Sequence, residues 1–208
     1  MQILAVSDHV VDAVYGAGIE ERFADIDLVV SCGDLPYSYL EYIVTTLNVP
    51  CLYVHGNHDR PEFRSSGEVL TEPGGWSDLD GRSMERDGVL FAGLEGSIRY
   101  KPGESFQYTE QQMAWKAWRM TPTLLRNRVR YGRYVDILIT HSPPRGIHDG
   151  DDLAHRGFET FIGFMDRFKP RFLLHGHKHV YGTEPTSTRY AETEVINVCP
   201  YRVISYSR

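Results

Sequence analysis

Five short segments of the sequence carry side chains of the types that bind metal ions. Each follows an apolar run, and in chain order they are Val6-Ser7-Asp8-His9, Cys32-Gly33-Asp34, His55-Gly56-Asn57-His58-Asp59, Thr140-His141-Ser142-Pro143-Pro144 and His175-Gly176-His177-Lys178-His179. A single Asp after a strand is usually a turn former or a helix cap. Five such segments instead predict one shared site, because ligands bind where chains turn at the carboxyl edge of a sheet.

The donor types indicate which chemistry this site would perform. The donors are carboxylates, imidazoles and one amide oxygen, without a thiolate. Such a set is typical of a site for Mn, Fe or Zn ions and less typical of a structural zinc site. The number of ligands indicates two ions. A carboxylate such as Asp34 can bridge two cations about 3.5–4 Å apart, which polarise phosphoryl oxygens and acidify a shared water. The expected reaction is hydrolysis of a phosphate ester.

The elements that position these segments are predicted by the apolar pattern. Short β-branched runs alternate with amphipathic stretches, which is typical of an α/β fold with a mixed sheet. We expect strands near residues 2–7, 27–32, 50–55, 88–94, 135–140, 171–175, 180–189 and 194–206. The last strands are closely spaced, so we expect hairpin connections between them.

Helices are predicted where apolar residues recur every three or four positions. Residues 40–47 and 158–168 show this spacing and predict two crossover helices. A longer helix is expected to begin near Thr109, which has capping-box spacing to Gln112. Pro122 is expected to end or kink it. Residues 60–87, rich in Gly, Pro, Ser and charge, predict a long loop with one short hairpin.

Length and charge exclude several classes of protein. The 208 residues fit one domain, which we place at residues 1–208. A net charge of −6 provides no basic stripe for a nucleic-acid backbone. No apolar run reaches the roughly 18 residues of a membrane span, and the first residues lack a cationic leader. The partner expected is a small phosphate ester, with no long nucleic acid and no membrane.

Two groups of residues are more simply explained by burial than by chemistry. Cys32, Cys51 and Cys199 lie in or beside apolar runs, so we expect reduced buried thiols, which favours a cytoplasmic location. Trp115 and Trp118 would form either a stacking platform or a partly buried helix face, and residue statistics favour the buried face.

In order and spacing, the five segments resemble the blocks D-x-H, G-D, G-N-H-D/E, H and G-H-x-H of the calcineurin-like metallophosphoesterase superfamily. The resemblance spans nearly the whole chain, and residues 141–149 and 174–182 look most like the small cyclic-nucleotide-phosphodiesterase-type branch. It implies a four-layer α-β-β-α sandwich of two mixed sheets flanked by helices. It also implies a phosphodiesterase or phosphatase that uses a metal-bridging hydroxide.

The resemblance further implies a role for each matching residue. Two divalent ions, Mn or Fe with Zn as the alternative, would be held by Asp8 and His179 at the first site, by Asp34 as the bridge, and by Asn57, His141 and His177 at the second site. His58 would face the substrate, where an imidazole can protonate a leaving alkoxide. Asp59 would orient that imidazole and keep it protonated.

The first block departs from the family pattern. Val10 stands where the family has His, and His9 occupies the variable position. Side chains alternate along a strand, so His9 is expected to point away from Asp8 unless the chain has already turned. In that reading Val10 packs at the start of a following helix. The first metal site is then expected to be weak, or to need high Mn.

Two other functions remain open at this point. A scaffold that keeps the fold without turnover would explain Val10, whereas the intact Gly56-Asn57-His58-Asp59 favours an enzyme. A nuclease would need basic DNA-binding elements, which this acidic chain does not provide.

Several residues near the five segments have either a local or a substrate role. Arg145 and His148 would hang over the metals on a stiff proline-rich turn. Arg99, Tyr100 and Tyr37 are further candidates of the same kind. For His55, His155 and His175 a local structural role is favoured.

Overall fold

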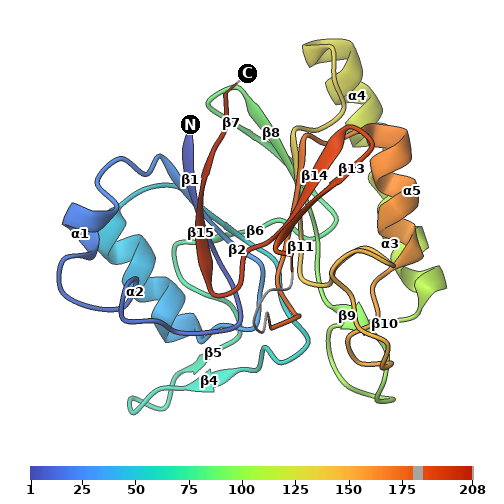
Figure 1. Cartoon of the computed structure of the whole chain (residues 1–208). Coiled ribbons are helices and arrows are strands. Elements are labelled where there is room, and N and C mark those ends of the chain that lie inside the picture. The colour runs from blue at the N-terminus through green and yellow to red at the C-terminus, as the bar shows by residue number, and fades with distance from the viewer. Residues whose placement is uncertain (180–184, 208) are drawn as a thin grey trace.

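The computed structural model describes residues 1–179 and 185–207 and has four layers, with two sheets packed face to face and helices outside (Figure 1). The first sheet has the order β15 (Tyr201–Ser205), β1 (Gln2–Val6), β2 (Leu28–Ser31), β3 (Cys51–Tyr53) and β6 (Ser77–Asp78). The second has the order β13 (Ser187–Tyr190), β14 (Thr193–Asn197), β12 (Phe172–His175), β11 (Ile137–Thr140), β8 (Val89–Leu94) and β7 (Ser83–Arg86). The predicted four-layer α/β sandwich of two mixed sheets is confirmed.

Both sheets are mixed because parallel strands at their centres are flanked by antiparallel ones. β15 is antiparallel to β1, β13 to β14 and β7 to β8, and the other neighbours are parallel. Side chains alternate along each strand, so one half of them packs between the two sheets and the other half packs under the helices. Ile3 and Ala5 of β1 pack between the sheets, whereas Leu4 and Val6 pack under the helices of the first sheet. Each such buried side chain contributes about 1.5–3 kcal/mol.

Helices cover the outer face of each sheet. α1 (Ile19–Arg22) and α2 (Tyr37–Leu47) lie on the first sheet, and α3 (Glu110–Arg119), α4 (Thr121–Tyr131) and α5 (Glu159–Phe168) lie on the second. Two small pairs complete the fold, the β4 (Glu62–Phe63) and β5 (Val69–Leu70) hairpin and the parallel pair β9 (Ser97–Ile98) and β10 (Gln107–Tyr108). None of the described helices is long and apolar enough to cross a bilayer.

The helices confirm most of what the spacing predicts. Both crossover helices form as α2 and α5, and Thr109 and Gln112 make the reciprocal bonds of a capping box. Pro122 does follow the end of α3, but it also lies in the first turn of α4, which the sequence did not predict. A proline is tolerated there because the first N–H groups of a helix have no intrahelical partner. No helix begins at Val10, whose side chain is 46% exposed.

The C-terminal strands differ from the prediction. The single strand expected at 194–206 is two strands in different sheets, since the chain leaves β14 after Asn197 and enters β15 at Tyr201. Pro200 lies in the crossing and has no N–H to continue a ladder. The strand expected at 180–189 falls partly outside the described residues, and its described part forms the predicted hairpin with β14. In residues 60–87 the predicted hairpin is β4–β5, and β6 and β7 are additional.

Candidate metal centre

Three of the predicted ligands sit in a backbone conformation that L residues rarely adopt. Asp8, Asp34 and His177 have φ angles of 65°, 58° and 67°, each just after a parallel strand. Non-glycine residues in this left-handed region cluster at functional sites, because the surrounding structure must hold them there. The turn at Asp8 also ends the strand alternation, so the position of His9 does not follow from it.

Two glycines let the chains approach closely enough for the carboxylates to meet. A Cβ at Gly56 would lie 2.0 Å from Asp34 Oδ1, and one at Gly176 would lie 1.8 Å from Ser7 Oγ and 2.4 Å from Asp8 Oδ2. Real side chains do not tolerate such distances. The glycine of each block is therefore a spatial requirement of the site.

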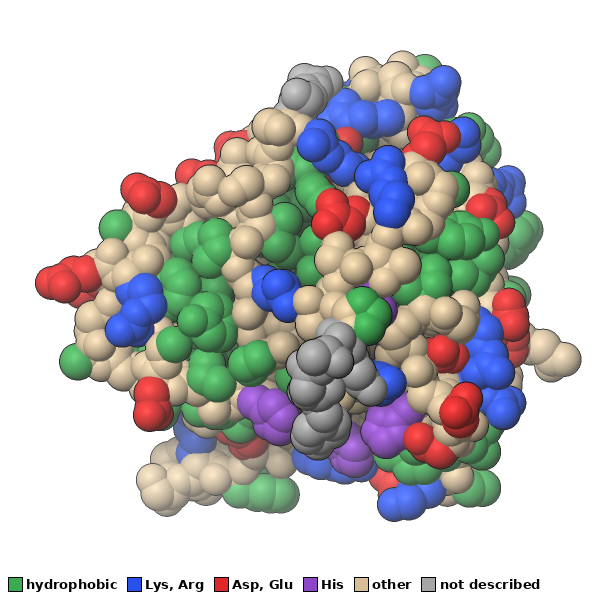
Figure 2. Space-filling view, viewed as in Figure 1, with side chains coloured by type: hydrophobic (Ala, Val, Ile, Leu, Met, Phe, Trp, Pro, Cys, Tyr) green, Lys and Arg blue, Asp and Glu red, His purple; other side chains and the backbone are tan. Residues whose placement is uncertain are grey.

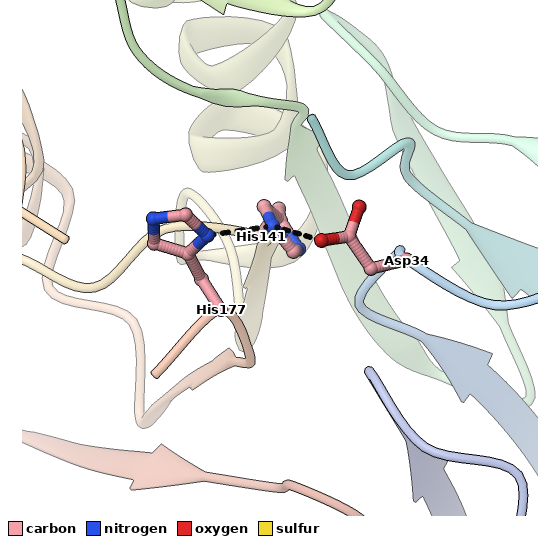
Figure 3. A group of neighbouring side chains, drawn as sticks. All are labelled: Asp34, His141 and His177. Atoms are coloured by element: carbon pink, nitrogen blue, oxygen red, sulfur yellow. Dashed lines mark hydrogen bonds and ion pairs between the residues drawn. The ribbon is translucent and has the colours of Figure 1, made fainter. Parts of the chain in front are cut away.

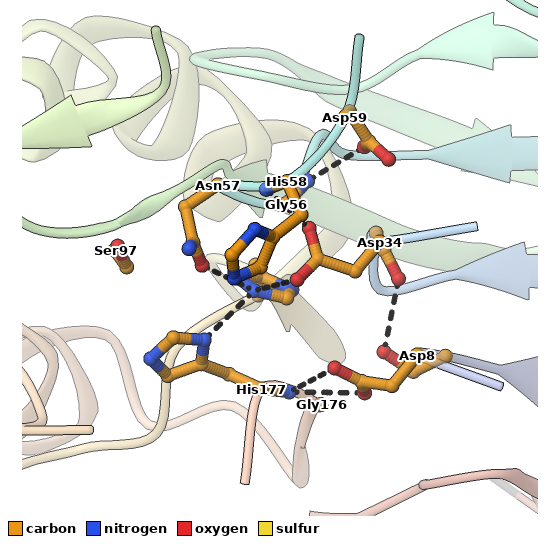
Figure 4. Close-up of polar contacts among 12 residues, drawn as sticks. Asp8, Asp34, Gly56, Asn57, His58, Asp59, Ser97, Gly176 and His177 are labelled. Carbon is orange, nitrogen blue, oxygen red and sulfur yellow. Dashed lines mark hydrogen bonds and ion pairs between the residues drawn. The ribbon is translucent and has the colours of Figure 1, made fainter. Parts of the chain in front are cut away.

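Four side-chain atoms converge on one point at the end of the second sheet (Figures 3 and 4). His141 Nε2 lies 3.0 Å from Asn57 Oδ1, 3.3 Å from Asp34 Oδ2 and 3.0 Å from His177 Nδ1. His141 and Asn57 are fully buried and His177 nearly so. The structure thus brings together the three ligands predicted for the second ion and the predicted bridging carboxylate.

The outer atoms of these side chains fix which atoms face inward. His141 Nδ1 lies 2.7 Å from Cys32 O, and His177 Nε2 lies 2.6 Å from Ala154 O. A carbonyl only accepts, so each of these ring nitrogens carries a proton, and in the neutral form of each ring the opposite nitrogen presents a lone pair. Asn57 Nδ2 donates to the hydroxyl of Tyr100 at 3.0 Å, which turns Oδ1 inward. Four lone pairs that face one another fit a cation.

The charges around this point have the sign that a cation needs. Burial opposes a positive charge on His141, but Asp34 and Asp8 outweigh burial and raise the pKa of His141 to about 9. Burial lowers the pKa of His177 to about 3, and the neighbouring His141 adds to that effect. For Asp34, burial raises the pKa, yet the charge and hydrogen bond of His141 lower it overall. The carboxylates therefore make this buried point electronegative.

A pocket of about 280 Å³ opens beside the cluster and brings in residues from the first sheet as well. It is lined by Asp8, Asp34, His58, His155, His177 and His179. The Asp8 carboxylate is held there by the backbone N–H of His177, at 3.1 and 3.0 Å from its two oxygens. Figure 2 shows histidine side chains gathered on one small part of the surface. The residues predicted for the first ion thus lie next to those predicted for the second.

The first site is less tightly assembled than the second. Among the His, Cys, Asp and Glu residues in the described ranges, the group whose ligand atoms all lie within 4.8 Å of one another is Asp34, His141 and His177. Asp8 and His179 reach the same pocket without joining that group. The ring of His9 lies 4.3 Å from the ring of His179, so His9 does not point away from this region as strand alternation predicted.

His58 and Asp59 have different contacts from each other. The His58 backbone N–H donates to Asp34 Oδ1 at 2.7 Å, while its exposed side chain lines the pocket. Asp59 accepts a hydrogen bond from the Gly56 N–H at 2.8 Å. Burial, helped by the charge of Asp34, raises the pKa of Asp59 to about 6. The Asp59 carboxylate therefore braces the loop that carries Asn57, a contact different from the predicted one with the His58 imidazole.

The proline-rich turn after β11 places its residues differently from the prediction. Arg145 forms an ion pair with Asp149 at 3.0 Å, and His148 lies 3.0 Å from His175 Nε2. His155 makes the local contact expected of it, with its Nδ1 2.9 Å from Asp152, and it also lines the pocket. No pattern in the sequence marks His155 as a pocket residue, because it lies in a polar loop far from any strand end.

The remaining candidates, Tyr100, Arg99, Tyr37 and His175, make contacts within the protein around the cluster. Tyr100 holds Asn57, and Arg99 donates to Gln107 and Gln112. Tyr37 is buried with its ring 6.2 Å from that of His55. His175 makes the local bond expected of it, to Gly176 O at 2.9 Å.

A buried ionic network lies beneath the Gly56–Asp59 loop. His55 Nδ1 pairs with Glu95 at 3.1 Å, and Lys116 from α3 pairs with Glu95 at 3.0 Å and with Asp80 at 2.8 Å. The Tyr108 hydroxyl also donates to Glu95. This network ties α3 and β8 to the residue that precedes the metal-binding loop.

Comparisons with known proteins agree with this geometry. The profile of the calcineurin-like phosphoesterase family matches residues 1–181. A crystal structure of a Thermus thermophilus protein matches with a TM-score of 0.61 and 17% identity, covering 95% of this chain and 88% of that one. A putative 5'-nucleotidase from Staphylococcus aureus, in complex with alpha-ketoglutarate, gives a TM-score of 0.48 and 12% identity over 94% of this chain and 48% of that one. A comparison with curated sequences found no match.

Two packed mixed sheets carry His, Asp and Asn side chains after the ends of their parallel strands, and Asp34, His141 and His177 among them are placed so that they could hold a metal ion. The family match covers most of the chain, so the protein belongs to the calcineurin-like phosphoesterase family. That membership supports metal-dependent hydrolysis of phosphate esters in general, with divalent ions whose identity is open.

Proposed function

We propose that this protein hydrolyses a small phosphate ester at a dinuclear metal centre in the pocket beside His58. The convergence of four lone-pair atoms around His141 Nε2 is the observation that carries the proposal. Asp34, Asn57, His141 and His177 would hold one divalent ion, and Asp8, Asp34 and His179 the other. Such ions, of which Mn or Fe fit the donor set and Zn is an alternative, supply positive charge that polarises a phosphate and acidifies water.

The protein's own side chains have separate tasks in this proposal. Asp34 is the shared ligand, because Oδ1 is fixed by the His58 N–H while Oδ2 faces His141. His58 projects into the pocket, where it donates a proton to the leaving oxygen. Asp59 is a positioning residue that acts through the Gly56 backbone.

We propose a phosphodiester, such as a cyclic nucleotide, as the substrate, with a phosphomonoester as the alternative. The small pocket and the net charge of −6 favour a small ester over a long nucleic acid. The resemblance of residues 141–149 and 174–182 to the cyclic-nucleotide branch favours the diester. A cytoplasmic location is also proposed, since three free thiols fit a reducing compartment.

The test uses metal-stripped protein with Mn titrated back, and bis-p-nitrophenyl phosphate and p-nitrophenyl phosphate as substrates. We expect Mn-dependent turnover that falls at least about a hundredfold in Asp34→Ala and in His58→Ala. Asp25→Ala removes an exposed carboxylate that does not line the pocket and is expected to retain full activity. The ratio of the two rates separates diesterase from monoesterase.

Tight Mn binding without hydrolysis of either ester, or of a panel of cyclic nucleotides, would contradict catalysis and favour the scaffold. Turnover that survives Asp34→Ala would place the reaction elsewhere in the protein.

A further inference from the structure

An apolar stripe runs along the solvent side of α3 and α4. Trp115 and Trp118 are 57% and 65% exposed, and Leu125 and Val129 are 48% and 89% exposed. Pro122 between them is also exposed. Soluble proteins bury side chains of this size unless the surface has a partner. The stripe therefore calls for an explanation that the metal centre does not provide.

The two helices present this stripe as one continuous surface. Thr121 is buried beside the junction, and the other buried residues recur every four or three positions through it: Met113, Ala117, Met120, Leu124 and Asn127. Met120 at the junction has helical φ and ψ of −73° and −19°. At 100° per residue, the exposed set falls directly opposite the buried set. The junction therefore does not interrupt the stripe.

The spacing of the stripe indicates what kind of surface it fits. Its members alternate between three-residue and four-residue steps, as the apolar positions of a heptad repeat do. Such a stripe is narrower than the apolar face by which an amphipathic helix lies in a bilayer. A second helix, packed lengthwise, covers a seam of this width.

The charges beside the stripe indicate the chemistry of that helix. The whole chain has a charge of −6, yet α3 and α4 carry Lys116 and four arginines against the single carboxylate of Glu110. Lys116 is paired with Asp80 and Glu95. The four arginines are Arg119, Arg126, Arg128 and Arg130. Within residues 1–179 and 185–207, none of them forms an ion pair.

The position of the arginines argues against a second copy of the chain as the partner. Arg119, Arg126 and Arg130 follow one edge of the stripe by the same 100° geometry. A copy packed antiparallel on this seam would bring these arginines near its own, and a parallel copy would bring them near the edge that carries Arg128; like charges at such positions are destabilising. An acidic helix would pair with them.

A groove beside Trp118 provides a place for a partner side chain. It has a volume of about 230 Å³ between α3 and α5, and its walls include Ala114, Trp118, Gly163 and Phe164. Arg167 also lines it. If a helix docked on the stripe, one of its apolar side chains would enter this groove, and a neighbouring Asp or Glu would reach the arginines.

We propose that the α3–α4 stripe docks an amphipathic helix of another protein, with apolar residues in heptad spacing and Asp or Glu at the flanking positions. The surface is separate from the metal centre: α4 leads into the start of β11, whereas His141 follows the end of that strand (Figure 1). The inference therefore does not depend on the proposed hydrolysis.

The probe is a synthetic helix of three heptads with Leu at the apolar positions and Glu at the flanking ones. Trp115 and Trp118 report binding by their fluorescence, while Trp76 is buried and serves as the constant background. We expect a saturable blue shift, and a dissociation constant at least about tenfold weaker in Arg119→Glu/Arg126→Glu. Val129→Asp is expected to abolish the shift, whereas Arg189→Glu, an exposed arginine on β13, is expected to leave it unchanged.

Three results would overturn the proposal. The first is equal or tighter binding of a matched peptide with Lys in place of Glu. The second is a shift with phosphatidylserine vesicles and none with the Glu peptide, which would assign the stripe to a bilayer. The third is concentration-dependent dimerisation in sedimentation that Val129→Asp removes, which would assign it to a second copy. Circular dichroism and Mn-dependent hydrolysis, both expected to be unchanged, confirm that each variant is folded.

Discussion

At the scale of single residues, the site depends on two glycines that leave room for the carboxylates. Gly56 and Gly176 have no side chain, and only for that reason do the carboxylates of Asp34 and Asp8 approach the loops that carry the other ligands. At the proposed first site Val10 stands where the family pattern has His, and the ring of His9 lies close to that of His179. The second site is therefore the better formed of the two.

Gly176→Ala tests this dependence on space. We expect a loss of about 1–3 kcal/mol in unfolding free energy, because the new methyl group overlaps Ser7 and displaces Asp8. The control is Gly163→Ala in α5, where an added Cβ meets no atom within 4 Å and a helical alanine is expected to stabilise by up to about 1 kcal/mol. Urea unfolding and Mn calorimetry measure both effects. Equal stability and Mn affinity in the two variants would show that the close approach does not matter.

At the scale of elements, the loop after β3 is held by a charge network that comes from other parts of the chain. Glu95 follows β8 and pairs with His55 just before the loop, and Lys116 on α3 pairs with Glu95. Burial alone would raise the pKa of Glu95, but the hydrogen bond of His55, the charge of Lys116 and the Tyr108 hydroxyl outweigh it and lower the pKa to about 2. The charged form of Glu95 is thus the form that the fold stabilises.

Glu95→Gln tests this network through its pH dependence. The folded pKa of about 2 lies below the ordinary value of 4.5, so the stabilisation is complete above pH 4.5 and is lost as the pH falls toward 2. We expect the variant to lose about 3 kcal/mol at neutral pH, because one partner of a buried pair is removed. The gap between the two proteins closes in acid. Unfolding curves from pH 7 to 3 measure that gap, and a gap that stays constant would contradict the role of the charge.

At the scale of the whole molecule, two sheets with separate helical covers meet at one end. The residues that follow the parallel strands β1, β2 and β3 of one sheet and β12 of the other line the same pocket, and His141 after β11 joins the cluster beside it. Asp34 from the first sheet and His141 from the second are in direct contact. A cation bound there would therefore link the two halves of the fold.

Metal binding is expected to stabilise the whole protein for that reason. With free Mn at a hundredfold excess over its dissociation constant, linkage predicts a gain of about 2.7 kcal/mol and a thermal midpoint several degrees higher. Thermal unfolding with and without Mn measures the change. Asp34→Ala is expected to remove most of it, and an undiminished shift in that variant would mean that Mn binds elsewhere.

The sequence by itself determined the family, the fold class and most of the strands, and it predicted the ligand set. Periods of two and of three to four residues record which side chains face a core, and the five blocks mark the strand ends where a site forms. These signals are local, so they are readable without the structure. They also predicted the capping box at Thr109, which depends only on neighbours in the chain.

Only the tertiary structure decided the features that depend on distant residues. Asp59 reaches Gly56, and His155 enters the pocket from a polar loop, because of how the chain turns and not because of spacing. The split of residues 194–206 between two sheets is another such case, since both parts have the same apolar pattern. The exposure of Trp115 and Trp118 has the same cause. Either face of α3 could have been buried, and in the structure the face with Met113 and Ala117 packs against the core, which leaves the two tryptophans outside.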